Sequence, residues 1–329
     1  MKRIAPLALV ALATLAPPAL TQATTTGPRL DFPLACVPGK TCEIQHYVDR
    51  DPGPGVRDYR CGVQTYQGHS GIDIRVPDMA AQKRGVEVLA AAAGKVVRLR
   101  DGVADISIRT EGAPPVANQE CGNAVVLDHG GGWETQYCHM ARGSLRVKQG
   151  DVVAPGAPLG RVGLSGNTEY PHLHLTVRRA GVVVDPFAPT PGATCGVQPG
   201  LWTARAQAVM AYTSGAVLNA GFSSGAVTAA QIEAGAVPGP SRSAPYLVAY
   251  ARAIALQAGD VVTFDLKGPD GASLASVTAP ALPRWQAQGF RFIGKKTPPG
   301  GWRPGTYVAD YRVLRGGKPV ISRRFVVRL

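Results

Sequence analysis

Residues 122–140, GNAVVLDHGGGWETQYCHM, contain two strand-like runs joined by three consecutive glycines. The runs NAVVLD and WETQYCHM are rich in β-branched and aromatic residues, and the glycines between them supply the turn. The stretch therefore predicts a β-hairpin. Cys121 and Cys138 lie nearly symmetrically about the turn, so we expect them to face each other across the two strands and to form a disulfide.

Similar runs surround this hairpin and predict an antiparallel, all-β domain over residues 61–190. They include VEVLAAAAGKVVRL at residues 86–99, DISIRT at 105–110 and HLHLTVRR at 172–179, separated by glycines and prolines. Residues 150–166 are typical of tight turns between strands and contain no segment long enough for a convincing helix. Residues 24–60, rich in Pro, Gly and Cys, predict an irregular segment held by disulfides.

A second domain is predicted after a Pro- and Gly-rich boundary. We assign residues 191–240 to a linker and first strands, and residues 241–329 to a β-sandwich of immunoglobulin-like type, because short alternating runs follow one another with Asp-Gly and Gly-Gly turns. This domain shows no catalytic cluster of ionisable residues, which favours a role in binding, positioning or support. Trp285 and Trp302 are expected in its core, the alternative being exposed rings that stack on sugar.

The N-terminus predicts export. Residues 1–23 combine Lys2 and Arg3 with a short apolar run and small residues near Ala23, the pattern of a cleaved signal peptide. Because the run is short and contains Pro17 and Pro18, an uncleaved anchor is the weaker alternative. We expect a periplasmic or extracellular protein with no stable membrane span after cleavage.

Cysteine content and charge agree with export. The chain has 6 cysteines, which predicts three disulfides in an oxidising compartment. Once Cys121 and Cys138 are paired, four cysteines remain: Cys36, Cys42, Cys61 and Cys195. These four can form two disulfides in three different arrangements. The net charge is +13, or +11 without the two signal-peptide cations. Because the basic residues are scattered, we expect an anionic envelope polymer or membrane surface rather than nucleic acid, unless the charge only aids solubility.

Three short motifs carry ligand chemistry. In GHSGID, His69 and Asp73 are four residues apart, so they share a face of an extended segment and offer a nitrogen and an oxygen of the kinds that bind zinc. In PHLHLTV, His172 and His174 alternate and project to one side of a strand. His139 ends the hairpin in YCHM. Two further histidines are assigned to structure or surface: His46 and His129.

The order of these motifs resembles that of the lysostaphin-type (LytM-like) zinc metallopeptidases, which cut peptide bridges in peptidoglycan. The resemblance covers residues 68–186 and rests on GHSGIDI, on residues 122–140, on VKQGDVVAPGAPLGRVGLSG at 147–166 and on PHLHLTV followed by VVDPF. It implies a compact antiparallel sheet with one zinc per chain at the floor of a groove.

Residue by residue, the resemblance implies zinc ligands at His69, Asp73 and His174. Three protein ligands leave one tetrahedral position for water, as a catalytic site requires. The resemblance assigns catalytic roles to His139 and His172: one takes the proton of the attacking water, and one or both stabilise the oxyanion.

The function predicted on this basis is a zinc endopeptidase acting on peptidoglycan stem peptides, at D-Ala to diaminopimelate cross-links where the host wall has them. One alternative is a catalytically silent relative that binds peptidoglycan or activates an amidase; another is a zinc enzyme with a different target. Two segments lengthen loops that we expect to border the groove: residues 79–84, MAAQKR, and the segment around residues 111–120. The sequence does not decide whether the segment before Cys61 covers the groove as an inhibitory strand. The sequence names no protein partner.

Overall fold

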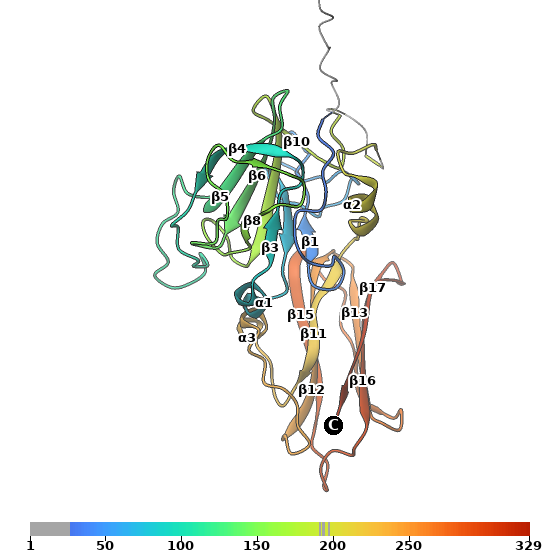
Figure 1. Ribbon diagram of the computed structural model, residues 1–329. Helices are drawn as coiled ribbons and strands as arrows, with labels where there is room; N and C mark the ends of the chain where they lie inside the picture. The colour runs from blue at the N-terminus through green and yellow to red at the C-terminus, as the bar shows by residue number, and fades with distance from the viewer. Residues whose placement is uncertain (1–26, 191, 193–194, 197) are drawn as a thin grey trace, which may run out of the picture.

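The computed structural model describes residues 27–190, 192, 195–196 and 198–329, so the predicted signal peptide lies outside it. Two β-rich domains stack end to end, with the N-terminal domain above the C-terminal one in Figure 1. Nearly all regular structure is antiparallel β, which confirms the predicted fold class. None of the helices in the described part of the chain has the length and apolar content needed to span a bilayer.

The N-terminal domain is built on one antiparallel sheet. The path along the sheet is β1-β2-β9-β6-β5-β4-β7, with β10 also paired to β9. The strands in chain order are β1 (Glu43–His46), β2 (Ile72–Arg75), β4 (Gly94–Arg100), β5 (Asn123–Asp128), β6 (Trp133–Met140), β7 (Val152–Val153), β9 (His172–Arg179) and β10 (Val182–Val184). A small sheet of β3 (Glu87–Leu89) and β8 (Pro158–Arg161) completes the domain.

The predicted hairpin is confirmed as β5 and β6. Val125 lies opposite Tyr137, and the glycines of the turn all have positive φ, a conformation that glycine adopts without a Cβ clash. Buried residues of these strands, including Leu127 and Tyr137, form part of a core beneath the sheet. The structure joins Cys121 to Cys138 at the open end of the hairpin.

The remaining cysteines are paired by the structure in one of the arrangements that the sequence left open. Cys36 bonds Cys42 within the N-terminal segment, and Cys61 bonds Cys195 across 134 positions of sequence. The prolines and glycines of residues 24–60 predicted an irregular segment. This prediction is wrong in part, because β1 lies within the segment and extends the main sheet. The predicted insertion at residues 79–84 forms helix α1 (Met79–Arg84), which Asp78 caps through its side chain.

The C-terminal domain is a sandwich of two antiparallel sheets. One contains β11 (Ala216–Ser223), β12 (Tyr246–Leu256) and β15 (Gln286–Lys296); the other has the order β14 (Ser273–Thr278), β13 (Val261–Lys267), β16 (Thr306–Arg315) and β17 (Lys318–Arg328). Seven strands in two sheets match an immunoglobulin-like sandwich, with the fourth strand beside the third rather than the fifth. Trp302 is buried in the core, as predicted, but the same prediction is wrong for Trp285, which is half-buried and lines a cavity instead.

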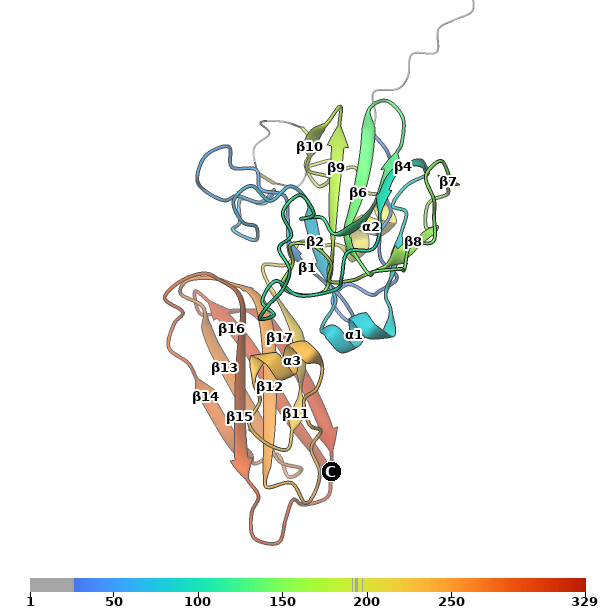
Figure 2. The ribbon, with the colours of Figure 1, turned by 90° about the vertical axis from the view of Figure 1, so that its left-hand side faces the viewer.

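Two short helices follow the N-terminal domain in sequence: α2 (Ala204–Val209), which precedes the sandwich, and α3 (Ala229–Ala234), which lies between β11 and β12. In both views α3 lies beside α1 at the boundary between the domains (Figures 1 and 2). The buried cation of Arg75 on β2 and that of Arg252 on β12 both contact the carboxylate of Glu233 on α3. The C-terminal domain is thereby tied to the strand that carries Asp73.

Candidate metal centre

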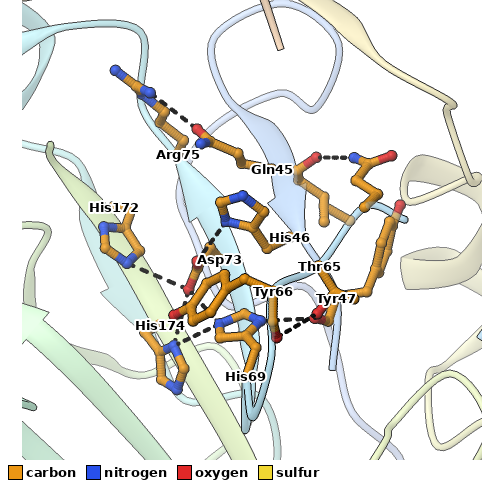
Figure 3. Close-up of polar contacts among 12 residues, drawn as sticks. Gln45, His46, Tyr47, Thr65, Tyr66, His69, Asp73, Arg75, His172 and His174 are labelled. Atoms are coloured by element: carbon orange, nitrogen blue, oxygen red, sulfur yellow. Dashed lines mark hydrogen bonds and ion pairs between the residues drawn. The ribbon is translucent and has the colours of Figure 1, made fainter. Parts of the chain in front are cut away.

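The five residues singled out in the sequence come together on one face of the main sheet. Asp73 on β2 lies directly opposite His174 on β9, so their side chains project to the same side. His172 begins β9 two residues earlier, and His139 lies near the end of β6 on the other side of β9. His69 precedes β2 and turns its ring toward the same point (Figure 3).

Three of these side chains form a compact set of ligand atoms. His69 Nε2 lies 3.1 Å from Asp73 Oδ1 and 3.2 Å from His174 Nδ1. His174 Nδ1 is 2.9 Å from the same carboxylate oxygen. Zinc bonds of 2.0–2.1 Å in a tetrahedron place neighbouring ligand atoms about 3.3 Å apart, so the three separations are close to those of a zinc site.

The opposite nitrogens of both ligand histidines have partners of their own. His69 Nδ1 donates to the Tyr47 carbonyl over 2.7 Å, and His174 Nε2 lies 3.0 Å from Thr176 Oγ1. When His69 Nδ1 and His174 Nε2 carry the protons, the lone pairs of His69 Nε2 and His174 Nδ1 point to the candidate metal position. Such outer contacts set the tautomer and orientation of metal-binding histidines. The donor set, two imidazoles and one carboxylate, therefore fits zinc and leaves a fourth position open.

His139 and His172 lie next to the triad but outside it. Their ring centroids are 4.6 Å apart, and both side chains are buried. His139 Nδ1 donates to the Ser165 carbonyl at 2.8 Å, while His172 Nδ1 donates to the Tyr170 carbonyl at 3.0 Å. The Nε2 of each ring thus faces the site, and that of His172 lies 3.3 Å from Asp73 Oδ1.

The backbone at His139 is held in the left-handed region, with φ of 60°. A non-glycine residue there is uncommon and must be held by its surroundings. The His139 N–H donates to the Cys121 carbonyl, and its own carbonyl accepts from Gly163. The Cys121–Cys138 disulfide therefore lies directly beside the segment that orients His139.

His46 lies at the site, whereas its sequence context predicts a structural or surface residue. Its Nδ1 donates to Asp73 Oδ2 over 2.9 Å, and its side chain is 5% exposed. The residue lies on β1 directly opposite Asp73, so that Asp73 is flanked by His46 and His174 on its two neighbouring strands. Its position in EIQHYV, outside the three motifs, carried no local signal. His129 is remote from this set and contacts Ala93 and Thr135.

Electrostatics favour an ionised Asp73 and a neutral His139. Burial opposes charge on Asp73, but the neighbouring imidazoles, His69 and His172 foremost, hold its pKa well below the usual range. Burial, with the charges of His172 and His174, holds the pKa of His139 well below its ordinary value. An imidazole that is neutral near pH 7 can accept a proton.

An open cavity of about 870 Å³ gives access to these groups. Asp73, His139 and His172 line it, together with His46 and Tyr66. The segment of residues 105–110 borders the cavity through Ile108 and Arg109. From the described residues before Cys61, Gln45 and His46 contribute to the wall, and these described residues leave the cavity open.

Comparison with known proteins shows that the central part of the chain resembles a peptidase family. Residues 67–186 match the profile of Peptidase family M23. Cell division protein DipM of Caulobacter vibrioides is 31% identical over 125 residues, which is 38% of this chain and 17% of DipM. The DD-carboxypeptidase/endopeptidase Mpg of Neisseria meningitidis is 34% identical over 135 residues, 40% of this chain and 26% of Mpg. The chain thus spans about a quarter or less of these relatives.

One solved structure is the catalytic domain of lysostaphin from Staphylococcus simulans. It is 23% identical, and the match covers 43% of this chain and 85% of that domain with a TM-score of 0.28. At that score the structural likeness supports no inference about function.

Proposed function

Because residues 67–186 form a domain of peptidase family M23, as the resemblance to lysostaphin-type peptidases implied, we propose that this protein is an exported zinc metallo-endopeptidase that hydrolyses peptide cross-links of peptidoglycan. The observation that carries the proposal is the convergence of three ligand lone pairs, from His69, Asp73 and His174, beside two further imidazoles that line an open cavity together with Asp73. The three disulfides support export, because such bonds persist in oxidising compartments.

The triad would hold one zinc ion. The chemistry that bound zinc supplies is polarisation of the peptide carbonyl and a lowered pKa for the attacking water. None of the three ligands has to release a proton to bind zinc. Asp73 is ionised, and the two ligand histidines keep their protons on the nitrogens that face Tyr47 and Thr176.

His139 and His172 move the protons. Each donates its Nδ1 proton to a backbone carbonyl, which fixes the tautomer and leaves Nε2 on the side of the candidate metal site, where Nε2 of His172 lies 3.3 Å from Asp73 Oδ1. A neutral Nε2 accepts the proton of the attacking water and, once protonated, donates a hydrogen bond to the developing oxyanion or passes the proton to the leaving amine. The two rings lie close enough to share these tasks within one cavity.

The decisive experiment is digestion of cross-linked peptidoglycan by the purified protein, with and without a chelator, followed by mass spectrometry of the muropeptides. We expect loss of dimeric muropeptides that the chelator prevents and added zinc restores. Intact dimers in the presence of stoichiometric zinc would contradict the proposal and favour the catalytically silent alternative.

Two variants separate metal binding from proton transfer. His174→Ala should lose both zinc and turnover, because it removes a ligand. His139→Ala should keep zinc and lose turnover by about 10²–10⁴-fold, the range for removal of a general acid–base. His129→Ala is the matched control, since this histidine lies outside the site. Full activity in His139→Ala would refute the role assigned to it.

A further inference from the structure

The C-terminal domain reaches the cavity that contains the candidate catalytic histidines. Residues 284–288, at the start of β15, line the same cavity as Asp73, His139 and His172. Figure 2 shows β15 among the strands of the lower domain, which lies against the domain that carries β1 and β2. The sandwich therefore forms one wall of the cavity, and this wall includes Trp285, which the sequence offered as an alternative ligand-stacking residue.

Buried polar contacts hold this wall in place. Arg75, fully buried, donates through Nη1 to Gln288 Oε1 at 3.0 Å and to Gln45 Oε1 at 3.0 Å. Its Nη2 contacts Glu233, the carboxylate that also binds Arg252 of the sandwich. A charge taken out of water needs such partners, so the two domains are held in one relative position at the edge of the cavity.

The same arginine connects the wall to a catalytic side chain. The guanidinium of Arg75 stacks on the ring of Tyr170 at 3.8 Å, and Gln45 donates to the Tyr170 hydroxyl. The carbonyl of Tyr170 accepts the Nδ1 proton of His172. The position of the C-terminal domain and the orientation of His172 therefore depend on shared contacts.

Arg284 is the charged group of this wall that is left for a ligand. Four residues lining the cavity carry formal charge: Asp73, Arg109, Glu169 and Arg284. Asp73 is enclosed by imidazoles, and Arg109 pairs with Glu169 at 2.8 Å. Among the described residues, no carboxylate lies within ion-pair distance of Arg284, which is exposed. A guanidinium in this setting suits a carboxylate, which it can bind through two parallel hydrogen bonds.

We propose that the C-terminal domain forms part of the substrate site and that Arg284 binds a carboxylate of an acidic peptide substrate lying in the cavity. Trp285, half-buried beside it, presents an aromatic ring to the same cavity. This proposal rests on the proposed function for the identity of the substrate, since stem peptides carry free carboxylates. It assigns to the sandwich domain the selection of substrate by charge.

The test measures binding without turnover. Zinc-loaded His139→Ala protein is titrated calorimetrically with a stem tetrapeptide that carries free carboxylates and with its fully amidated counterpart. We expect the acidic peptide to bind about tenfold more tightly, the value of one exposed charge-assisted hydrogen bond, and the added substitution Arg284→Gln to remove this difference. Arg284→Lys should retain part of it, because the charge remains while the bidentate geometry is lost.

The matched control is Arg324→Gln, which removes the same charge from β17 outside the cavity. It should leave the preference for the acidic peptide unchanged. An Arg284→Gln protein that still discriminates, or an Arg324→Gln protein that loses discrimination equally, would overturn the proposal. Failure of the wild-type protein to cleave peptidoglycan would refute the proposed function but not this binding difference, so the two outcomes are distinguishable.

In active protein, Arg284→Gln should raise KM about tenfold on acidic muropeptides and leave kcat nearly unchanged, since the contact forms in both the bound substrate and the transition state. A loss confined to kcat would contradict a role in binding.

Discussion

Replacement of His46 tests whether the N-terminal strand is part of the metal site. His46 Nδ1 donates over 2.9 Å to Asp73 Oδ2, while the other carboxylate oxygen, Oδ1, faces His69 and His174. Asp73 is 2% exposed, so His46→Ala leaves a buried carboxylate oxygen without its donor. The carboxylate would then be less firmly oriented toward the metal.

The magnitude follows from the role of outer contacts in metal sites. Loss of one such partner costs 10–100-fold in metal affinity, or about 1.4–2.7 kcal/mol. We expect a value toward the upper end, because among the described residues His46 is the hydrogen-bond donor that contacts Oδ2. His46→Asn keeps an N–H donor near the position of Nδ1, so it should recover much of the affinity.

The assay is competition for zinc with a chelator of known affinity, read by its absorbance, with circular dichroism to verify folding. His129→Ala serves as the matched histidine control and should bind zinc as the wild type does. Zinc affinity unchanged in a folded His46→Ala protein would refute the reasoning, as would equal losses in the Ala and Asn variants.

Three further predictions concern stability. Burial raises the pKa of Glu43 to about 7, so between about pH 4.5 and 7 the unfolded chain releases this proton while the folded protein keeps it. Stability should therefore fall as the pH rises through this window, by at most about 3 kcal/mol, and thermal unfolding of Glu43→Gln should show a weaker pH dependence than the wild type. Joint replacement of Cys121 and Cys138 by Ala opens a loop with a sequence separation of 17 and should cost about 3 kcal/mol. The zinc content of that variant should persist while turnover falls, because the disulfide adjoins the backbone that orients His139; unchanged turnover would argue against this link. Glu233→Gln leaves two buried arginines with no carboxylate between them and should lower the free energy of unfolding by about 3 kcal/mol in denaturant titrations, whereas an unchanged midpoint would show that the domain contact does not depend on this ion pair.

The sequence by itself determined the strands and most of the candidate site. Alternation along β9 places His172 and His174 on one face wherever that strand lies, because the side-chain period of a strand is two. The hairpin followed from two strand-like runs around three glycines, and its geometry brought Cys121 and Cys138 together. These features depend on local backbone geometry, which neighbouring residues specify.

Tertiary structure decided the contacts between residues that lie far apart in the sequence. His46 reaches Asp73 only because β1 pairs with β2, a register that its own four residues do not specify. Arg284 borders the cavity because Arg75, Glu233 and Arg252 hold the two domains together. Such contacts join residues as far apart as 213 positions in the sequence. They depend on which buried polar groups form hydrogen bonds with one another after the domains have packed.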